Sequence, residues 1–409
     1  MTERSSGTTG AVSEAVQPIY ERKVSAEIRE WLNVRQRELS IVTTTRTSSG
    51  QIVDWIPIES QVPGGPIATP PPALPAARLF NTPRTELEAQ PEARGPRGTV
   101  PVVRPDLERI HARGSIEDFL SRYGKAGVAN PHRMEGSVAR SFPKPLIGGG
   151  IDPKYAGSYQ NVAAYGIDAK INIWNPFVQQ GFLINDMSLA QIAVTRGSGL
   201  GLQTVEAGWQ DYPPKYGDAN PHLFVYYTRN GYSQDGNYLG GYNKEVLGWV
   251  QSSATVAPGA VLSPTSTAGA ANQFEIWLQW RLSGGNWWLW FVNQWIGYYP
   301  GWLFSQSGLQ TQGAQVIVQG EVADSNIWVS TSTDMGSGNF ASAGWGSAAY
   351  MRQIRYLSSS AATLTKYSPT AIVVTNSNCY SHVGGYGSND QTWLSHFFFG
   401  GPGKNVNCP

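Results

Sequence analysis

The second part of this 409-residue sequence is poor in acidic side chains. After position 150 it contains four glutamates, at positions 206, 245, 275 and 321. The net charge of the chain is +1, which provides no basic surface for nucleic acid or for an anionic membrane. No apolar run reaches the roughly 18 residues that a membrane-spanning helix needs. Residues 1–23 also lack the apolar segment of about 7–15 residues that is typical of a secretory signal peptide.

The common catalytic motifs are absent as well. The sequence has no G-x-S-x-G elbow, P-loop, G-x-G-x-x-G or H-E-x-x-H motif. A histidine triad or a zinc site would require His222, His382 and His396 to converge, and their spacing does not indicate this. Cys379 and Cys408, 29 residues apart, match no usual metal motif. We predict that they form one disulfide, with free thiols as the alternative, and we expect no metal or other cofactor.

The composition changes sharply near residue 150. Residues 1–150 contain 35 charged side chains and two tryptophans, whereas the following 259 residues contain 24 and 13. We therefore predict an N-terminal region of a helix and a hairpin over 1–62, a proline-rich linker with the remainder of that region over 63–150, and a main domain over 151–409.

Four segments of the N-terminal part have recognisable patterns. Residues 12–40 have apolar positions at helical spacing and predict a helix interrupted or started at Pro18. Residues 40–60 predict a β-hairpin that turns at positions 48–50. Residues 63–105 carry 11 prolines and predict an extended, exposed linker. A short helix is expected over 105–122.

The main domain has one strand pattern after another. The segments rich in β-branched and aromatic residues are 169–178, 189–197, 222–232, 274–282, 286–300 and 314–323. The sequence Ser283-Gly284-Gly285-Asn286 predicts a hairpin turn between two aromatic strands. With at least eight strands and short connections, the pattern predicts an all-β, antiparallel two-sheet sandwich.

Because other catalytic groups are scarce, paired carboxylates are the chemistry that remains. Neighbouring strands can present two acids on one face of a sheet, where one proton is shared between them. The ionised acid can then activate water while the protonated acid polarises a carbonyl. Glu206 and Glu321 are the candidates, since the nearby Gly208 and Gly320 would let a substrate backbone approach. The alternative is that each glutamate simply lies on the solvated face of its sheet.

Several long blocks of the sequence resemble the neprosin family of glutamic peptidases. The matching blocks are "TVEAGWQDYPPKYGDANPHLFVYYTRNGY" (204–232), "GGNWWLWFVNQWIGYYPGWLF" (284–304), "QGEVADS" (319–325), "TDMGSGNFASAGWGSAAYMRQI" (333–354) and the segment 378–409. The similarity extends from about residue 155 to residue 409. A weaker similarity to the N-terminal activation region of the family covers residues 44–61.

The resemblance implies a zymogen with an N-terminal pro-region of the α+β type and a concanavalin-like jelly-roll peptidase domain. It further implies a secreted endopeptidase, active at acid pH, that cuts after proline and uses Glu206 and Glu321 as its catalytic pair. Substrates would be proline-containing proteins or peptides, and the chain is expected to be a monomer without nucleic-acid or membrane partners.

A prolyl ring would pack well against an aromatic wall. Trp209, Tyr227 and Trp288 are candidates for such a substrate pocket, with the sandwich core as the alternative location for these side chains. If the acid pair is not catalytic, the competing interpretation is a tryptophan-rich sandwich that binds carbohydrate or protein.

Overall fold

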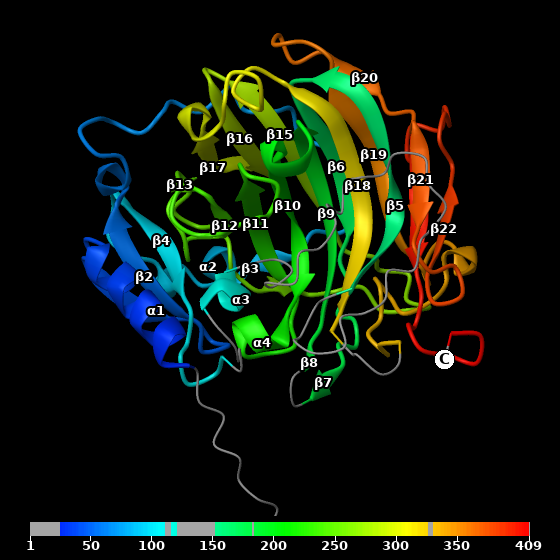
Figure 1. Ribbon diagram of the computed structural model, residues 1–409, viewed down its shortest axis with the longest axis horizontal. Coiled ribbons are helices and arrows are strands. Elements are labelled where there is room, and N and C mark those ends of the chain that lie inside the picture. Colours follow the sequence, from blue (N-terminus) through cyan, green and yellow to red (C-terminus); the bar gives the residue numbers. More distant parts are fainter. Residues whose placement is uncertain (1–24, 111–115, 121–151, 182–183, 326–329, 409) are drawn as a thin grey trace, which may run out of the picture.

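Two antiparallel sheets form the body of the protein in the computed structural model, which describes residues 25–110, 116–120, 152–181, 184–325 and 330–408 (Figure 1). The seven-stranded sheet has the order β12-β11-β10-β9-β18-β5-β21. Its strands are β5 (Asp152–Ala164), β9 (Met187–Arg196), β10 (Gln203–Asp211), β11 (His222–Thr228), β12 (Gly240–Tyr242), β18 (Gly313–Asp324) and β21 (Ala371–Val374).

The nine-stranded sheet has the order β13-β17-β16-β15-β6-β19-β23-β22, with β20 paired to β19. Its strands are β6 (Gly166–Asn172), β13 (Val250–Gln251), β15 (Glu275–Ser283), β16 (Asn286–Phe291), β17 (Gln294–Pro300), β19 (Ala349–Leu357), β20 (Leu364–Lys366), β22 (Ser381–Gly384) and β23 (Phe397–Gly400). Side chains from both sheets share one buried apolar cluster, so the sheets pack face to face. The predicted antiparallel two-sheet sandwich is confirmed.

The strand predictions hold except at some boundaries. Gly284 and Gly285 have φ values of 56° and 76°, as a two-residue hairpin turn of type I′ requires, and Ser283 pairs with Asn286. The predicted single strand over 286–300 is instead two strands, because Val292 has a φ of 54° and the chain turns there. The strand expected over 169–178 ends at Asn172.

A small N-terminal module lies beside the edge of the sandwich that carries β12 and β13 (Figure 1). It consists of α1 (Ala26–Glu38) and a sheet of β1 (Thr43–Arg46), β2 (Ile52–Pro57) and β4 (Thr99–Arg104). β1 and β2 pair antiparallel, which confirms the predicted hairpin. The third strand of this small sheet is β4, which belongs to the same module, so the hairpin does not extend a sheet of the sandwich. The predicted helix is present where its residues are described, and positions 12–24 lie outside the described residues.

The remaining short elements lie mainly in connections. They are η1 (Ile58–Gln61), β3 (Arg84–Thr85), α2 (Glu86–Ala89), η2 (Pro91–Ala93), α3 (Ile116–Leu120), β7 (Gln180–Gly181), β8 (Ile184–Asn185), η3 (Gly199–Gly201), α4 (Pro213–Tyr216), β14 (Leu262–Ser263), η4 (Gly301–Leu303) and η5 (Ala341–Ala343). Of the helix expected over 105–122, only α3 is helical among the described residues. No helix in the described part of the chain has the length and apolarity to cross a bilayer.

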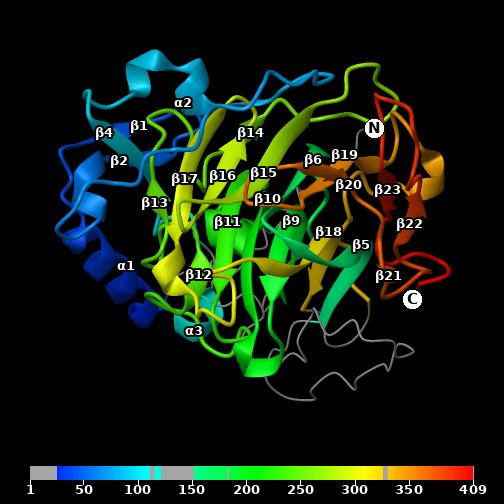
Figure 2. The same cartoon turned by 90° about the horizontal axis from the view of Figure 1, so that it is seen from above.

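Residues 62–81 have no regular secondary structure, and we call them the proline-rich strap. Figure 2 shows this part of the chain, in blue, running along the outside of the sandwich. Its apolar side chains pack against a tryptophan cluster on the nine-stranded sheet. The strap lacks helix and strand and about half of its residues are exposed, as predicted for a linker. The prediction is wrong in that the apolar side chains of the strap pack on the sheet and β4 continues the module sheet. Near the C-terminus, Cys379 and Cys408 are joined in a disulfide.

Candidate functional site

Glu206 and Glu321 lie on the same face of the seven-stranded sheet. Strand β9 separates their strands, with β10 on one side and β18 on the other. Glu206 is opposite Ala193 of β9, and Glu321 is opposite Leu189. These two β9 positions are four residues apart, and an even spacing keeps side chains on one face. We call this surface, which points away from the sandwich core, the glutamate face.

The register also indicates the separation of the two glutamates. Four residues along a strand span about 13 Å and two strand spacings span about 9.5 Å, so their Cα atoms are roughly 16 Å apart on a diagonal. Between the two glutamates, Gln191 of β9 is paired with Gln319 of β18 on one side and with Gly208 of β10 on the other. Both glutamates are fully buried, and both glutamines are at most 1% exposed. Two buried glutamine side chains thus lie between the two acids on this face.

Two hydroxyl groups hold the Glu206 carboxylate. Thr204 donates a hydrogen bond to its Oε1 at 2.8 Å, and Tyr232 donates to the same oxygen at 2.5 Å. Tyr232 lies in the loop after β11 with a φ of 61°, and its ring stacks on Tyr226 at 5.8 Å between centroids. Both hydroxyl groups donate to the same oxygen, so they fix the orientation of the carboxyl group.

Glu321 receives its contact from its own strand. The Gln319 amide donates to Oε2 of Glu321 at 3.1 Å. The prediction that Gly320 leaves room for a substrate is wrong, because position 320 points to the opposite face. A Cβ there would lie 2.4 Å from the ring of Phe399, inside the sandwich core. Gly208 lies on the glutamate face, but there a Cβ would meet the carbonyl oxygen of Ala190 on β9 at 1.9 Å.

The three aromatic pocket candidates lie elsewhere. Trp209 is three positions from Glu206, so it points into the core, where its indole donates to the Asn172 carbonyl at 2.8 Å. Tyr227 also lies in the core. Trp288 belongs to the nine-stranded sheet. The prediction that these side chains line a groove beside the glutamates is wrong. The alternative location, the sandwich core, is observed for Trp209 and Tyr227, whereas Trp288 lies in a separate cluster outside that core.

Sequence reasoning missed the aromatic side chains that do share the face. Tyr226 is the register partner of Glu206, and Phe224 is the partner of Gly208. Both are fully buried, and they pack with Tyr242. Burial raises the pKa of Tyr226 well above its ordinary value, and the nearby Asp235 acts in the same direction. Because alternate residues of a strand share a face, steps of two from Glu206 along β10 and from Tyr226 along β11 would have placed Tyr226 and Phe224 on this face.

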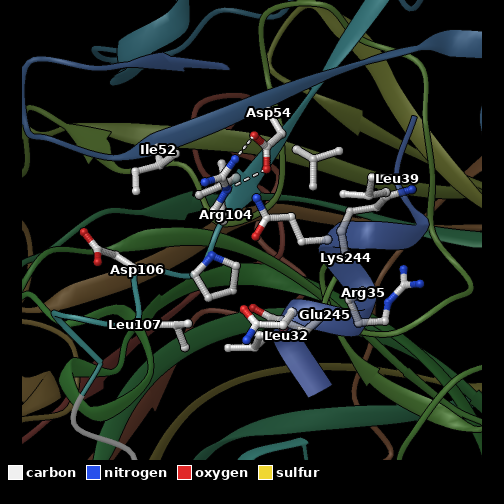
Figure 3. Close-up of a pocket in the computed structure, with 15 residues that line it drawn as sticks. Leu32, Arg35, Leu39, Ile52, Asp54, Arg104, Asp106, Leu107, Lys244 and Glu245 are labelled. Carbon is white, nitrogen blue, oxygen red and sulfur yellow. Dashed lines mark hydrogen bonds and ion pairs between the residues drawn. The ribbon is translucent and has the colours of Figure 1, made fainter. Parts of the chain in front are cut away.

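A cavity of about 210 Å³ lies between the N-terminal module and the sandwich (Figure 3). Its lining includes the ion pair of Asp54 with Arg104, and Lys244 and Glu245 from the loop after β12. Burial, and secondarily the charge of Arg35, lowers the pKa of Lys244 to about 7. The cavity shares no lining residue with the glutamate face, so it belongs to the contact between module and sandwich.

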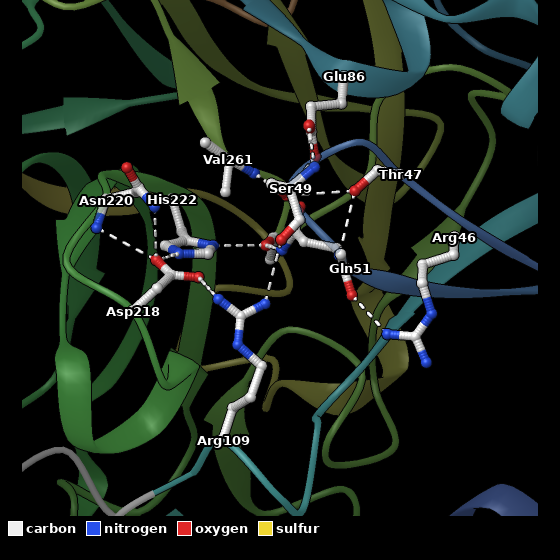
Figure 4. A network of polar contacts seen from close by, with 12 residues as sticks. Arg46, Thr47, Ser49, Gln51, Glu86, Arg109, Asp218, Asn220, His222 and Val261 are labelled. Atoms are coloured by element: carbon white, nitrogen blue, oxygen red, sulfur yellow. Dashed lines mark hydrogen bonds and ion pairs between the residues drawn. The ribbon is translucent and has the colours of Figure 1, made fainter.

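A second polar cluster fixes the tip of the hairpin to the sandwich (Figure 4). Arg109 lies 3.6 Å from Asp218 and donates to the Ser49 carbonyl at 3.2 Å. The ring of His222 contacts Asp218 at 2.9 Å and the Gly259 carbonyl at 2.7 Å. Burial alone would raise the pKa of Asp218, but the hydrogen bond and charge of His222 lower it. Within the described part of the chain, no group of three or more His, Cys, Asp and Glu side chains is arranged to hold a metal.

Comparison with known proteins places these features in context. Among solved structures, the chain is similar to Scytalido-glutamic peptidase with a peptide-based transition-state analogue, at 10% identity and a TM-score of 0.33, covering 62% of this chain and 99% of that one. It is also similar to SCP-B, a member of the Eqolisin family of peptidases in complex with the tripeptide Ala-Ile-His, at 9% identity and a TM-score of 0.30, with the same coverage. A third similarity is to CG-16, a homodimeric agglutinin from chicken liver, at 6% identity and a TM-score of 0.22, covering 42% of this chain and 94% of that one.

The sequence itself gives the more specific result. Residues 184–402, more than half of the chain, match the profile of the family described as Neprosin. This range includes both Glu206 and Glu321. The chain therefore belongs to the neprosin family.

Proposed function

We propose that this protein is a glutamic endopeptidase that hydrolyses peptide bonds with Glu206 and Glu321. Membership of the neprosin family supports a peptide hydrolase. The observation that carries the proposal is the position of two fully buried glutamates on one face of one sheet, on either side of β9. A buried carboxyl group is costly to keep unless it has hydrogen-bond partners or a chemical role.

The proposed mechanism uses the two carboxyl groups in different protonation states. Glu206, with its hydroxyl donors, is the ionised base that takes a proton from water. The water oxygen then bonds to the carbonyl carbon of the scissile peptide, while protonated Glu321 donates a hydrogen bond to the developing oxyanion. When the C–N bond breaks, the nitrogen leaves with the proton held by Glu206.

The finer properties of the enzyme are part of the same proposal. We infer acid activity, because Glu321 must be protonated while Glu206 is charged. We infer a pro-region in residues 1 to about 150 and cleavage after proline, on the resemblance of the sequence to neprosin peptidases. Export to an oxidising compartment is supported by the Cys379–Cys408 disulfide.

Cleavage of a proline-containing peptide between about pH 2 and 6 tests the proposed activity. We expect hydrolysis after proline that continues in the presence of pepstatin, because that inhibitor targets aspartic peptidases. Mass spectrometry of the same samples should show the 44.5 kDa chain shortening at its N-terminal side. Glycan binding without any peptide cleavage would instead favour a binding module, and full activity of an uncut chain would exclude the pro-region.

Replacing Tyr232 with Phe tests the assignment of Glu206 as the base. The substitution removes the 2.5 Å hydrogen bond to Oε1 and leaves the ring in place. Since the lost donor stabilises the charged carboxylate, the acidic limb of the kcat/KM profile should move to higher pH, with a several-fold loss at the low end. Tyr238→Phe is the control, because Tyr238 is also in a positive-φ loop conformation but is 38% exposed. An unchanged profile in Tyr232→Phe would contradict the assignment.

A further inference from the structure

The proline-rich strap occupies an aromatic surface on the outer face of the nine-stranded sheet. Trp288, Trp290, Trp295 and Tyr298 form this surface with Trp277 and Val250. Ring centroids lie 4.5 Å apart for Trp288 and Tyr298 and 5.2 Å apart for Trp290 and Trp295. The strap packs its apolar side chains on them, namely Val62, Ile67, Ala68, Leu74, Ala77 and Leu79. With the strap in place, these six surface residues are at most 7% exposed.

Side chains of this surface also bind the main chain of the strap. The Trp295 indole donates to the Pro72 carbonyl at 3.2 Å, and the Tyr298 hydroxyl accepts from the Ala68 amide at 3.0 Å. Contacts of this kind depend on the backbone path of the ligand and not on its side chains. An aromatic surface with an indole donor facing a proline-rich backbone is the chemistry by which extended proline-rich peptides are recognised.

Further along the strap, charged groups of the sheet continue the same pattern. Lys170 donates to the Arg78 carbonyl at 2.5 Å, and Arg352 donates to the same oxygen at 3.3 Å. Glu275 accepts from the Phe80 amide at 2.9 Å. All three sheet side chains are at most 2% exposed, and Arg352 also forms an ion pair with Glu275.

The side chain of Phe80 fills a pocket of its own. Its ring lies 4.0 Å from the Arg352 guanidinium carbon and 4.5 Å from the ring of Trp345. Tyr350 and Trp393 complete the pocket, with ring centroids 6.3 and 6.2 Å away. The pocket therefore offers one aromatic anchor point eight positions beyond Pro72.

We propose that the outer face of the nine-stranded sheet is a peptide-binding groove for an extended, proline-rich segment that carries an aromatic residue. In this chain the groove holds the protein's own strap, and the partner is a proline-rich segment of another protein that replaces it. The groove lies on the other sheet from Glu206 and Glu321. It would therefore hold a partner outside the glutamate face, whether or not the protein is a peptidase.

The test uses the full chain with a displaced strap. Ile67→Asp with Leu74→Asp places two charges against the tryptophan cluster and should release the strap. A fluorescently labelled synthetic peptide of residues 62–81 is then titrated, and mass spectrometry checks that it stays intact. We expect saturable binding to the double variant and at least tenfold weaker binding to the wild type, whose tethered strap competes at a high effective concentration.

Two controls test recognition. Adding Trp295→Phe to the double variant should weaken binding about fivefold, because one hydrogen bond to the peptide is lost. A peptide with alanine at positions 70–72 should bind more weakly than the natural one. A variant that is folded by circular dichroism but binds neither peptide, or binds both equally, would overturn the proposal.

Phe80→Ala provides an independent test if the double variant does not fold. This change empties the aromatic pocket and leaves the proline-rich part of the strap in place. N-acetyl-phenylalanine amide should raise the Tm of Phe80→Ala and leave the wild type unchanged, since ligand binding to the folded state stabilises it. The absence of any difference between the two chains would show that the pocket does not accept a ligand in trans, and the proposal would fail.

Discussion

Glu206→Gln and Glu321→Gln should each lower kcat/KM for a proline-containing peptide by about 10³-fold while the fold stays intact. Glutamine has the size of glutamate and can still accept the hydrogen bonds from Thr204 and Tyr232 at position 206. It cannot take a proton from water, and at position 321 it cannot supply a carboxylic acid proton to an oxyanion. The measurement is the rate of peptide cleavage at acid pH, with far-UV circular dichroism on the same samples.

The double variant gives a sharper result than either single one. If the two carboxyl groups act together on one water and one carbonyl, removing either one already abolishes their joint action. The double variant should then have nearly the same kcat/KM as each single variant. Glu245→Gln is a matched control, since Glu245 is buried and lies 3.1 Å from Lys215 at the module contact. We expect it to change stability and to leave kcat/KM within about twofold. Normal activity in both single variants would end the peptidase proposal.

The position of the glutamates could be predicted from the sequence because strands have a period of two. The segments 203–211 and 313–324 are continuous strands, so the side on which each residue lies follows from its number once one residue is placed. The same rule identifies the wrong pocket candidates: Trp209 is an odd number of positions from Glu206. The predictions for Trp209 and Gly320 failed because composition was considered without this alternation.

Other features could not be predicted from local patterns. Residues 63–105 have the composition of an exposed linker. Nothing in their own sequence shows that the apolar side chains of the strap pack on a tryptophan cluster far along the chain. Trp288 and Trp295 likewise lie in a segment whose composition suggests a sandwich core, but they belong to the cluster on which the strap packs. Tyr232 reaches Glu206 from a loop, so its contact depends on two consecutive residues with positive φ, Gly231 and Tyr232. These contacts are set by tertiary packing and not by periodicity.

Asp211 adds a pH dependence that the sequence did not indicate. It ends β10 on the core side, is fully buried, and neither of its carboxylate oxygens has a hydrogen-bond partner among the described residues. Burial, with a smaller contribution from the charge of Asp218, raises the pKa of Asp211 to about 8. In the unfolded chain the same carboxyl group titrates near its ordinary value of 3.8. Folding therefore takes up a proton at neutral pH and does not at acid pH.

The sign of the effect follows from this difference. Because the pKa is raised in the folded state, the stability that depends on protonated Asp211 is complete below about pH 3.8 and is lost progressively as the pH rises through about 8. At pH 7 the loss is of the order of 4 kcal/mol. The contribution of Asp211 to stability is thus largest in acid, the pH range proposed for the activity of the glutamate pair.

Asp211→Asn should therefore stabilise the protein at neutral pH and have little effect in acid. Asparagine is neutral at every pH, so the variant avoids the cost of protonating a buried carboxylate. Urea unfolding should give a free energy of unfolding higher than that of the wild type by up to about 4 kcal/mol at pH 7, with the difference closing towards pH 3.5. Asp390→Asn is the control, because Asp390 is exposed and its carboxylate accepts a turn hydrogen bond from the Thr392 amide, which asparagine can also accept. If Asp211→Asn were instead destabilising at pH 7, the carboxylate would have to be ionised and bound to a cationic or donor group, and the acid-stabilised fold inferred from its burial would be wrong.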